Sequence, residues 1–201
     1  MIGILGGTFD PVHLGHLDAA SQLRVAVGLT EVWLMPNCRP PHKVSPPVAS
    51  PGQRLQMVEL GIRGLPGLRA CDLEVERGGV SYTVDTLRAL RAEWPETVFT
   101  LLLGFDAALQ IGAWHEVATV LREASFVIFS RPSVEMPASR LDDLGFPAAR
   151  TRLVQITTPA ISARVIRDRL ALGEGVDDLI PPAVATFIRE HGLYPAHDGM
   201  G

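Results

Sequence analysis

Short apolar runs, separated by segments with helical spacing, are the feature that most constrains the fold of this 201-residue chain. Each run is four to six residues long and lacks the polar alternation of a strand with one face in water. Strands of this kind are typical of a parallel sheet that helices cover on both faces. We therefore expect strands at residues 2–5, 32–35, 98–103, 126–129 and 153–156.

The segments between these strands have the spacing and the end signals of helices. The first of them is followed by Gly28, a common helix stop, and Ser50 to Gln53 forms a capping box with proline at the first helical position. Strands that alternate with helices imply right-handed crossovers. The fold class that we predict is therefore α/β, with a doubly wound parallel sheet and helices on both faces. The expected helices are residues 14–27, 50–62, 86–94, 115–122, 163–172 and 182–191.

Length and composition favour a single domain, residues 1–201, in which residues 160–195 form a short helical C-terminal part and residues 196–201 a frayed tail. Hydrophobic residues make up 47% of the chain, enough for a substantial core. The net charge of −4 argues against a nucleic-acid partner. No apolar run approaches the roughly 20 residues of a membrane span. Together with two isolated cysteines and no signal-peptide pattern, this predicts a soluble cytoplasmic protein; its oligomeric state stays open.

Two stretches interrupt the alternation of strands and helices. Residues 36–51 carry six prolines and cannot form a regular element. Their composition fits an exposed linker and a binding loop equally well. Residues 133–152 are polar and irregular, and we expect them to form a surface excursion.

Gly6 and Gly7 lie between the first expected strand and the first expected helix. In parallel sheets, ligands gather beyond the carboxyl ends of strands, where loops and helix N-termini converge. Glycines let the backbone approach a phosphate closely, and the free amides of a helix start point toward it. A lone glycine pair is more often an ordinary turn, but here Pro11 and a pair of histidines accompany it. We therefore predict a phosphate site at this junction.

His13 and His16 are three residues apart, so both imidazoles fall on one face of the first helical turn, and Gly15 leaves room for a ligand there. Two imidazoles aimed at one point can donate hydrogen bonds to phosphoryl oxygens and stabilise charge on a leaving group. Zinc is a weaker interpretation, because no third ligand stands at a suitable spacing.

The whole segment resembles the signature of the nucleotidyltransferases with an H-x-G-H motif, and most closely that of the bacterial nicotinate-nucleotide adenylyltransferase family. Later motifs of that family follow in the same order. The resemblance implies a Rossmann-like fold and transfer of AMP from ATP to nicotinate mononucleotide, giving deamido-NAD and pyrophosphate. The matching segments are residues 6–16, 41–43, 81–86, 104–106 with Trp114, and 161–167.

The resemblance also implies residue roles. Four side chains would stabilise the transferring phosphoryl group, namely His13, His16, Lys43 and Arg167. The residues expected to bind ATP are Gly6, Gly7, Thr8, Phe9, Gly104, Asp106, Ser162 and Arg164. The acceptor would bind beside Lys43, Ser81, Tyr82, Thr83 and Trp114, with the ring stacked on the tryptophan. Magnesium (Mg²⁺) would be held by ATP and water, with no protein ligand.

One motif departs from the family pattern. Ala163 and Arg164 stand where the family usually has a serine and a threonine, so the phosphate contacts of that segment are in doubt. Arg164 could bridge phosphate oxygens or point to solvent. Three alternatives stay open: an adenylyltransferase for nicotinamide mononucleotide, one for phosphopantetheine, or a nucleotide sensor without catalysis, which this departure alone supports. A fragment of a tRNA synthetase fails on size and charge.

Overall fold

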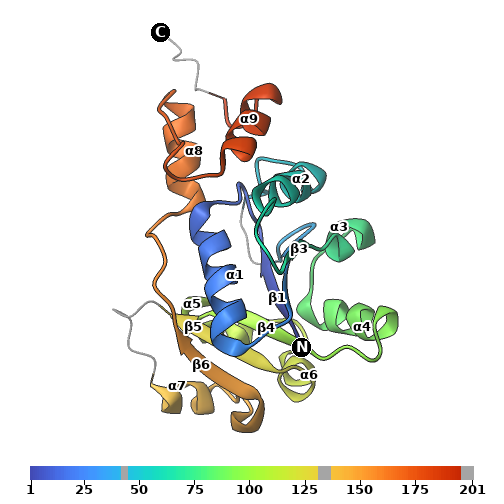
Figure 1. The fold of residues 1–201 in the computed structure, drawn as a ribbon. Coiled ribbons are helices and arrows are strands. Elements are labelled where there is room, and N and C mark those ends of the chain that lie inside the picture. Colours follow the sequence, from blue (N-terminus) through green and yellow to red (C-terminus); the bar gives the residue numbers. More distant parts are fainter. Residues whose placement is uncertain (42–44, 131–136, 196–201) are drawn as a thin grey trace.

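The computed structural model of the protein describes residues 1–41, 45–130 and 137–195. Its centre is a six-stranded sheet in the order β3-β2-β1-β4-β5-β6, and every neighbouring pair is parallel (Figure 1). The predicted doubly wound α/β sheet is thereby confirmed. The strands are β1 (Ile2–Gly7), β2 (Glu31–Pro36), β3 (Leu68–Ala70), β4 (Phe99–Gly104), β5 (Phe126–Ser130) and β6 (Thr151–Gln155).

Helices cover both faces of the sheet. Neighbouring strand residues point to opposite faces, so Leu5 belongs to one buried core and Ile4 to the other. The core around Leu5 is completed by α1 (Leu14–Val27), α2 (Pro51–Gly61), α8 (Ala163–Ala171) and α9 (Pro182–Glu190). The core around Ile4 is completed by α3 (Leu73–Arg77), α4 (Thr83–Glu93), α5 (Phe105–Leu109), α6 (Val117–Glu123) and α7 (Ala138–Asp143).

The end signals read from the sequence act as expected. Gly28 adopts the left-handed conformation, with a φ of 75°, and its N–H donates to the last carbonyls of α1. Ser50 and Gln53 form the reciprocal capping box that starts α2. The carboxyl end of β1 and the start of α1 lie near α8 (Figure 1). None of the helices in the described ranges combines the length and the apolar character needed to cross a membrane.

Several short elements were not predicted, namely β3, α3 and α5, and α4 begins earlier than expected. The expectation of an irregular excursion at residues 133–152 was wrong in part; residues 133–136 lie outside the described residues. The segment contains α7 and the 3-10 turn Ala148–Arg150, and Leu141 and Phe146 are buried. The Phe146 ring packs edge-on against Phe126, with ring centroids 5.0 Å apart. The two buried apolar side chains, Leu141 and Phe146, therefore pack this otherwise polar segment against the core.

Candidate active site

Two cavities open at the carboxyl ends of β1 and β4, the place where the strand order reverses and where such sheets bind ligands. The α4-side cavity encloses about 330 Å³ and is lined by Ile4, Thr8, Ser81, Tyr82, Thr83 and Trp114 among others. The α1-side cavity encloses about 540 Å³ and is lined by Leu5, His13, His16, Gly104, Asp106 and Ser162 among others. Because Ile4 and Leu5 face opposite sides of the sheet, the cavities lie on opposite faces. Both volumes suit a small ligand.

The predicted histidine pair stands in the α1-side cavity. His13 is the N-cap residue of α1, and its ring stacks on that of His16 with centroids 3.6 Å apart and planes 21° from parallel. The Phe9 ring meets His16 edge-on at 5.0 Å. A Cβ atom on Gly15 would stand 3.2 Å from Nδ1 of His13, so this glycine leaves room for the His13 ring. The geometry brings both imidazoles to one wall of the cavity.

His16 is neutral at physiological pH. Burial is the main reason that its pKa is lowered from 6.5 to about 3, and the nearby His13 lowers it further. Nδ1 of His16 has no hydrogen-bond partner within the described part of the chain. A neutral imidazole donates through one ring nitrogen and accepts through the other. In the free protein, His16 is therefore a hydrogen-bonding group and not a cation.

Three further predicted ATP residues reach the same cavity. Gly104 ends β4, and Asp106 lies exposed in the first turn of α5. Ser162 caps α8, because its hydroxyl accepts a hydrogen bond from the N–H of Val165 at 3.3 Å. The described residues contain no group of three or more His, Cys, Asp or Glu side chains able to hold a metal ion.

The two arginines of α8 differ in placement. Arg164 is 85% exposed and pairs loosely with Asp168 at 3.7 Å, so the structure does not bring it to the cavity. Arg167 turns inward and donates to the backbone oxygen of Asp10 at 2.7 Å. Its guanidinium therefore supports the loop between β1 and α1 and does not line either cavity. The predicted contact of each arginine with ATP stays a prediction.

The predicted acceptor residues gather in the α4-side cavity. Thr83 is the first residue of α4, and its N-cap, Tyr82, provides no side-chain cap. The first amides of the helix therefore have no side-chain acceptor, which suits an anionic group. Trp114 follows the 3-10 turn Ile111–Ala113 on the other wall, and the next residue, His115, packs on Tyr82 with ring centroids 4.4 Å apart.

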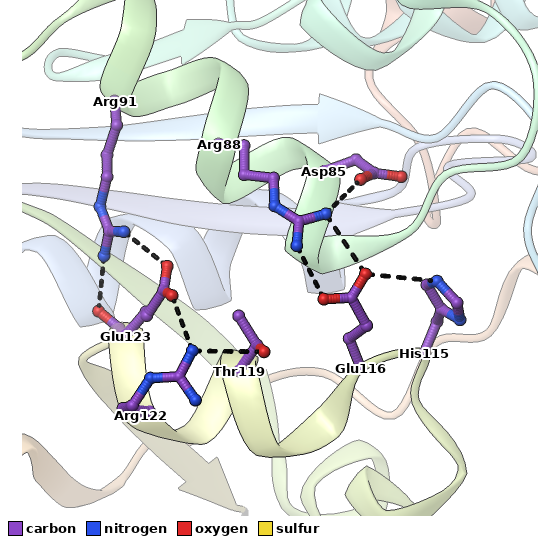
Figure 2. A network of polar contacts seen from close by, with 8 residues as sticks. All are labelled: Asp85, Arg88, Arg91, His115, Glu116, Thr119, Arg122 and Glu123. Atoms are coloured by element: carbon purple, nitrogen blue, oxygen red, sulfur yellow. Dashed lines mark hydrogen bonds and ion pairs between the residues drawn. The ribbon is translucent and has the colours of Figure 1, made fainter.

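An ion-pair network joins the two walls of this cavity. Arg88 of α4 reaches Glu116 at 2.7 Å, and Glu116 lies 3.7 Å from His115, as Figure 2 shows. A second set, in which Arg91 and Arg122 converge on Glu123, ties α4 to α6 farther along. Apart from the half-buried Glu123, the ion-paired side chains are largely exposed, and such pairs contribute little stability. Their effect is to fix the start of α4 relative to the segment that carries Trp114.

The glycine pair lines the α4-side cavity at the end of β1, directly after Leu5, which lines the α1-side cavity. Gly6 is exposed, and a Cβ added to it would meet no atom within 4 Å. A Cβ on Gly7 would stand 2.9 Å from the Phe9 ring, so Gly7 is required by packing. Phe9 has a φ of 49° and is buried. It therefore packs against Gly7 and His16 and lines neither of the two cavities. Gly6, Gly7 and Thr8, in contrast, line the α4-side cavity.

Sequence reasoning missed the polar groups that hold this loop. Asp10 is 3% exposed and accepts hydrogen bonds from the N–H groups of residues 48 and 49 and, at 2.7 Å, from the Tyr194 hydroxyl. Arg54 is fully buried and donates to the Thr8 carbonyl at 2.7 Å and to the Cys38 carbonyl at 2.9 Å. Arg54 could have been found, because it lies on the apolar face of α2. The sequence around Tyr194 carries no such signal.

The proline-rich stretch is described except at its centre. Residues 42–44 lie outside the described residues, so the role of Lys43 stays a prediction. The flanking residues Asn37, Pro40 and Pro41 line the α4-side cavity. Of the two interpretations of this stretch, the binding loop is therefore favoured.

Comparisons with known proteins agree with this geometry. A family described as cytidylyltransferase-like matches residues 4–169. The chain is 38% identical over 196 residues to a probable nicotinate-nucleotide adenylyltransferase of Dehalococcoides mccartyi, covering 96% of each chain. It is 39% identical over 203 residues to a protein of the same description from Symbiobacterium thermophilum, covering 100% of this chain and 98% of the relative.

A solved structure supports the fold. Nicotinic acid mononucleotide adenylyltransferase of Plasmodium falciparum, complexed with NaAD, superposes with a TM-score of 0.80, at 24% identity and with 96% of each chain covered. The predicted Rossmann-like fold is thereby confirmed.

Proposed function

The chain belongs to the nicotinate-nucleotide adenylyltransferases, within the cytidylyltransferase-like family, and we propose on that basis that it transfers AMP from ATP to nicotinate mononucleotide. The products are deamido-NAD and pyrophosphate, so the reaction is a step of NAD biosynthesis. The observation that carries the proposal is the pair of cavities on opposite faces of the sheet, which consecutive residues of β1 line: Leu5 on one face and Gly6 on the other. Two nucleotides can bind there, one on each face, with their phosphates meeting at the end of β1.

In this assignment, ATP occupies the α1-side cavity. A phosphate oxygen of the acceptor forms a bond to the α-phosphorus of ATP, while the bond from that phosphorus to the pyrophosphate oxygen breaks. The phosphate is already a competent nucleophile, so no protein nucleophile is needed, and catalysis consists of alignment and charge stabilisation. His13 and His16 donate hydrogen bonds to the phosphoryl oxygens. The Asp106 carboxylate accepts hydrogen bonds from the ribose hydroxyls of ATP.

The acceptor occupies the α4-side cavity. Its pyridine ring stacks on Trp114, and its carboxylate accepts hydrogen bonds from the amides at the start of α4, beside Tyr82 and Thr83. Lys43 adds positive charge where the two phosphates meet. Amide donors favour the acid over the amide, because the amide group would place its own N–H against them.

Magnesium fits this site as part of the nucleotide. The carboxylate that lines the α1-side cavity, Asp106, is assigned to the ribose, so Mg²⁺ would be held by substrate phosphates and water. When bound, it neutralises charge on the triphosphate. The protein's own share is to orient the α-phosphate against the histidines.

The test is pyrophosphate release from ATP and magnesium, with nicotinate mononucleotide and nicotinamide mononucleotide as acceptors in parallel. Much faster release with the acid is the expected result. Faster release with the amide would keep the chemistry and change the acceptor. If a folded protein that binds ATP releases no pyrophosphate with either acceptor, the proposal is refuted. The protein would then be a sensor or would use another acceptor, of which phosphopantetheine is the next to test.

A further inference from the structure

A buried carboxylate that the proposed mechanism does not use stands in the wall of the α4-side cavity. Glu74, in α3, is 9% exposed and lines this cavity. Burial raises its pKa, and hydrogen bonds from Thr86 and Ser81 with the charge of Arg77 partly offset that effect. A carboxylate in such a place is costly unless its oxygens are hydrogen-bonded, so its partners show what it holds in position.

The first partner belongs to α4. The Thr86 hydroxyl donates to Oε1 of Glu74 at 2.6 Å. The same hydroxyl oxygen accepts a hydrogen bond from Arg77 at 3.2 Å. Its single proton points to the carboxylate at 2.6 Å and not to the more distant Tyr82 carbonyl at 3.2 Å. Thr86 lies one turn after Thr83, so this contact fixes the N-terminal turn of α4 against α3.

The second partner leads to the proline-rich stretch. The Ser81 side chain lies near Glu74 and helps to lower its pKa, and its oxygen accepts the N–H of Cys38 at 2.9 Å. The backbone N–H of Ser81 donates to the Arg39 carbonyl at 3.0 Å. A hydroxyl that accepts from one group and donates to another transmits orientation between them. Through Ser81, the carboxylate therefore holds residues 38 and 39, which lead into the loop that carries Lys43.

We infer that Glu74 is a positioning residue for the acceptor: it holds the start of α4 and the segment before Lys43 in the arrangement that the acceptor nucleotide needs. This inference rests on the proposed function. The Thr86 hydroxyl donates to the carboxyl group and the Ser81 hydroxyl lies near it, so a group with two accepting oxygens suits both neighbours. An amide of the same shape offers one oxygen and one NH2 group, and therefore places a donor where the carboxyl group has its second acceptor.

The test compares Glu74→Gln with Glu76→Gln, a control on the same helix whose side chain is exposed. Both KM values and kcat are measured by pyrophosphate release. Glu74→Gln should raise the KM for nicotinate mononucleotide about tenfold, the scale of one hydrogen bond to a charged group. The KM for ATP should change less than about twofold, because ATP binds on the other face of the sheet. Glu76→Gln should match the unchanged enzyme.

Equal increases in both KM values would mean general loosening of the fold and would overturn the inference, as would an unchanged acceptor KM. If Glu74→Gln does not fold, Thr86→Val carries the test, because it removes one donor and leaves the carboxylate in place. The double variant should raise the acceptor KM no more than the stronger single variant, since both changes break one network. Failure of the proposed function has a different signature: the unmodified protein itself would release no pyrophosphate with either acceptor.

Discussion

Gly6→Ala should separate catalysis from stability. An added Cβ at Gly6 would meet no protein atom within 4 Å, and the φ of Gly6 lies outside the left-handed region. The folded protein therefore accommodates the methyl group without strain. Replacing glycine at such a site commonly stabilises a protein by about 0.4–1 kcal/mol, because the unfolded chain loses freedom. The variant should be as resistant to urea as the parent protein, or slightly more.

Its activity should fall about 100-fold. The methyl carbon stands about 1.5 Å beyond the Cα atom, on the wall of the α4-side cavity beside Leu5 of the α1-side cavity. A phosphate oxygen that packs against Gly6 would be displaced by roughly 1 Å, and a misplacement of that size costs on the order of 100-fold in rate, or about 2.7 kcal/mol. The loss should appear in kcat, because each nucleotide keeps most of its own cavity.

The control is Gly175→Ala, an exposed loop position where an added Cβ also meets no atom. It should leave kcat and both KM values unchanged. Steady-state pyrophosphate release and urea unfolding on the three proteins make the comparison. Full activity of Gly6→Ala would show that no phosphate passes over Gly6, and the arrangement of the two substrates would have to be revised. Lost stability would show that the space is not open.

Three further results are expected. Because the pKa of His16 is lowered from 6.5 to about 3, the unfolded state binds a proton before the folded state does as the pH falls below 6.5. The free energy of unfolding, measured with urea, should therefore decrease by at most about 3 kcal/mol between pH 6.5 and 4, and by less in His16→Asn. Tyr194→Phe removes the hydrogen-bond donor of the buried Asp10 carboxylate, so it should lower the free energy of unfolding by about 1–3 kcal/mol and also lower kcat. The control is Val184→Ala: if it loses stability at unchanged kcat, the fall in kcat of Tyr194→Phe is not a mere result of lower stability. Arg164→Ala should leave the KM for ATP within about twofold, because the side chain is 85% exposed; a larger rise would place it on phosphate.

The sheet could be predicted because strands buried on both faces leave uninterrupted apolar runs. β3 left no such run, since it is three residues long and lies at the edge beside β2. Its central residue, Arg69, holds its guanidinium 4.5 Å from the ring centroid of Trp33, a contact that depends on the neighbouring strand. Short edge elements are specified by what they pack against, and this information is not local in the sequence.

The candidate site divides in the same way. The glycine and histidine residues of the first turn could be predicted, because backbone freedom and helical spacing are local properties. The groups that hold this turn could not. Asp10 and Tyr194 are separated by 184 positions, yet their side chains share a hydrogen bond. Glu74 carried no local signal either, because its partners come from α4 and the loop before it.

On the proposed function, the neutral state of His16 bears on the charge repulsion between the two bound substrates. The sheet keeps the nucleotides apart until their phosphates meet near Gly6, where two polyanions repel each other. Two cations stacked at 3.6 Å would be unstable in the free protein, which is why burial and mutual repulsion keep His16 neutral. Bound triphosphate acts in the opposite direction, since nearby negative charge raises the pKa of an imidazole. We therefore expect that ATP binding favours protonation of His16, so that the protein should take up protons when it binds ATP near pH 6.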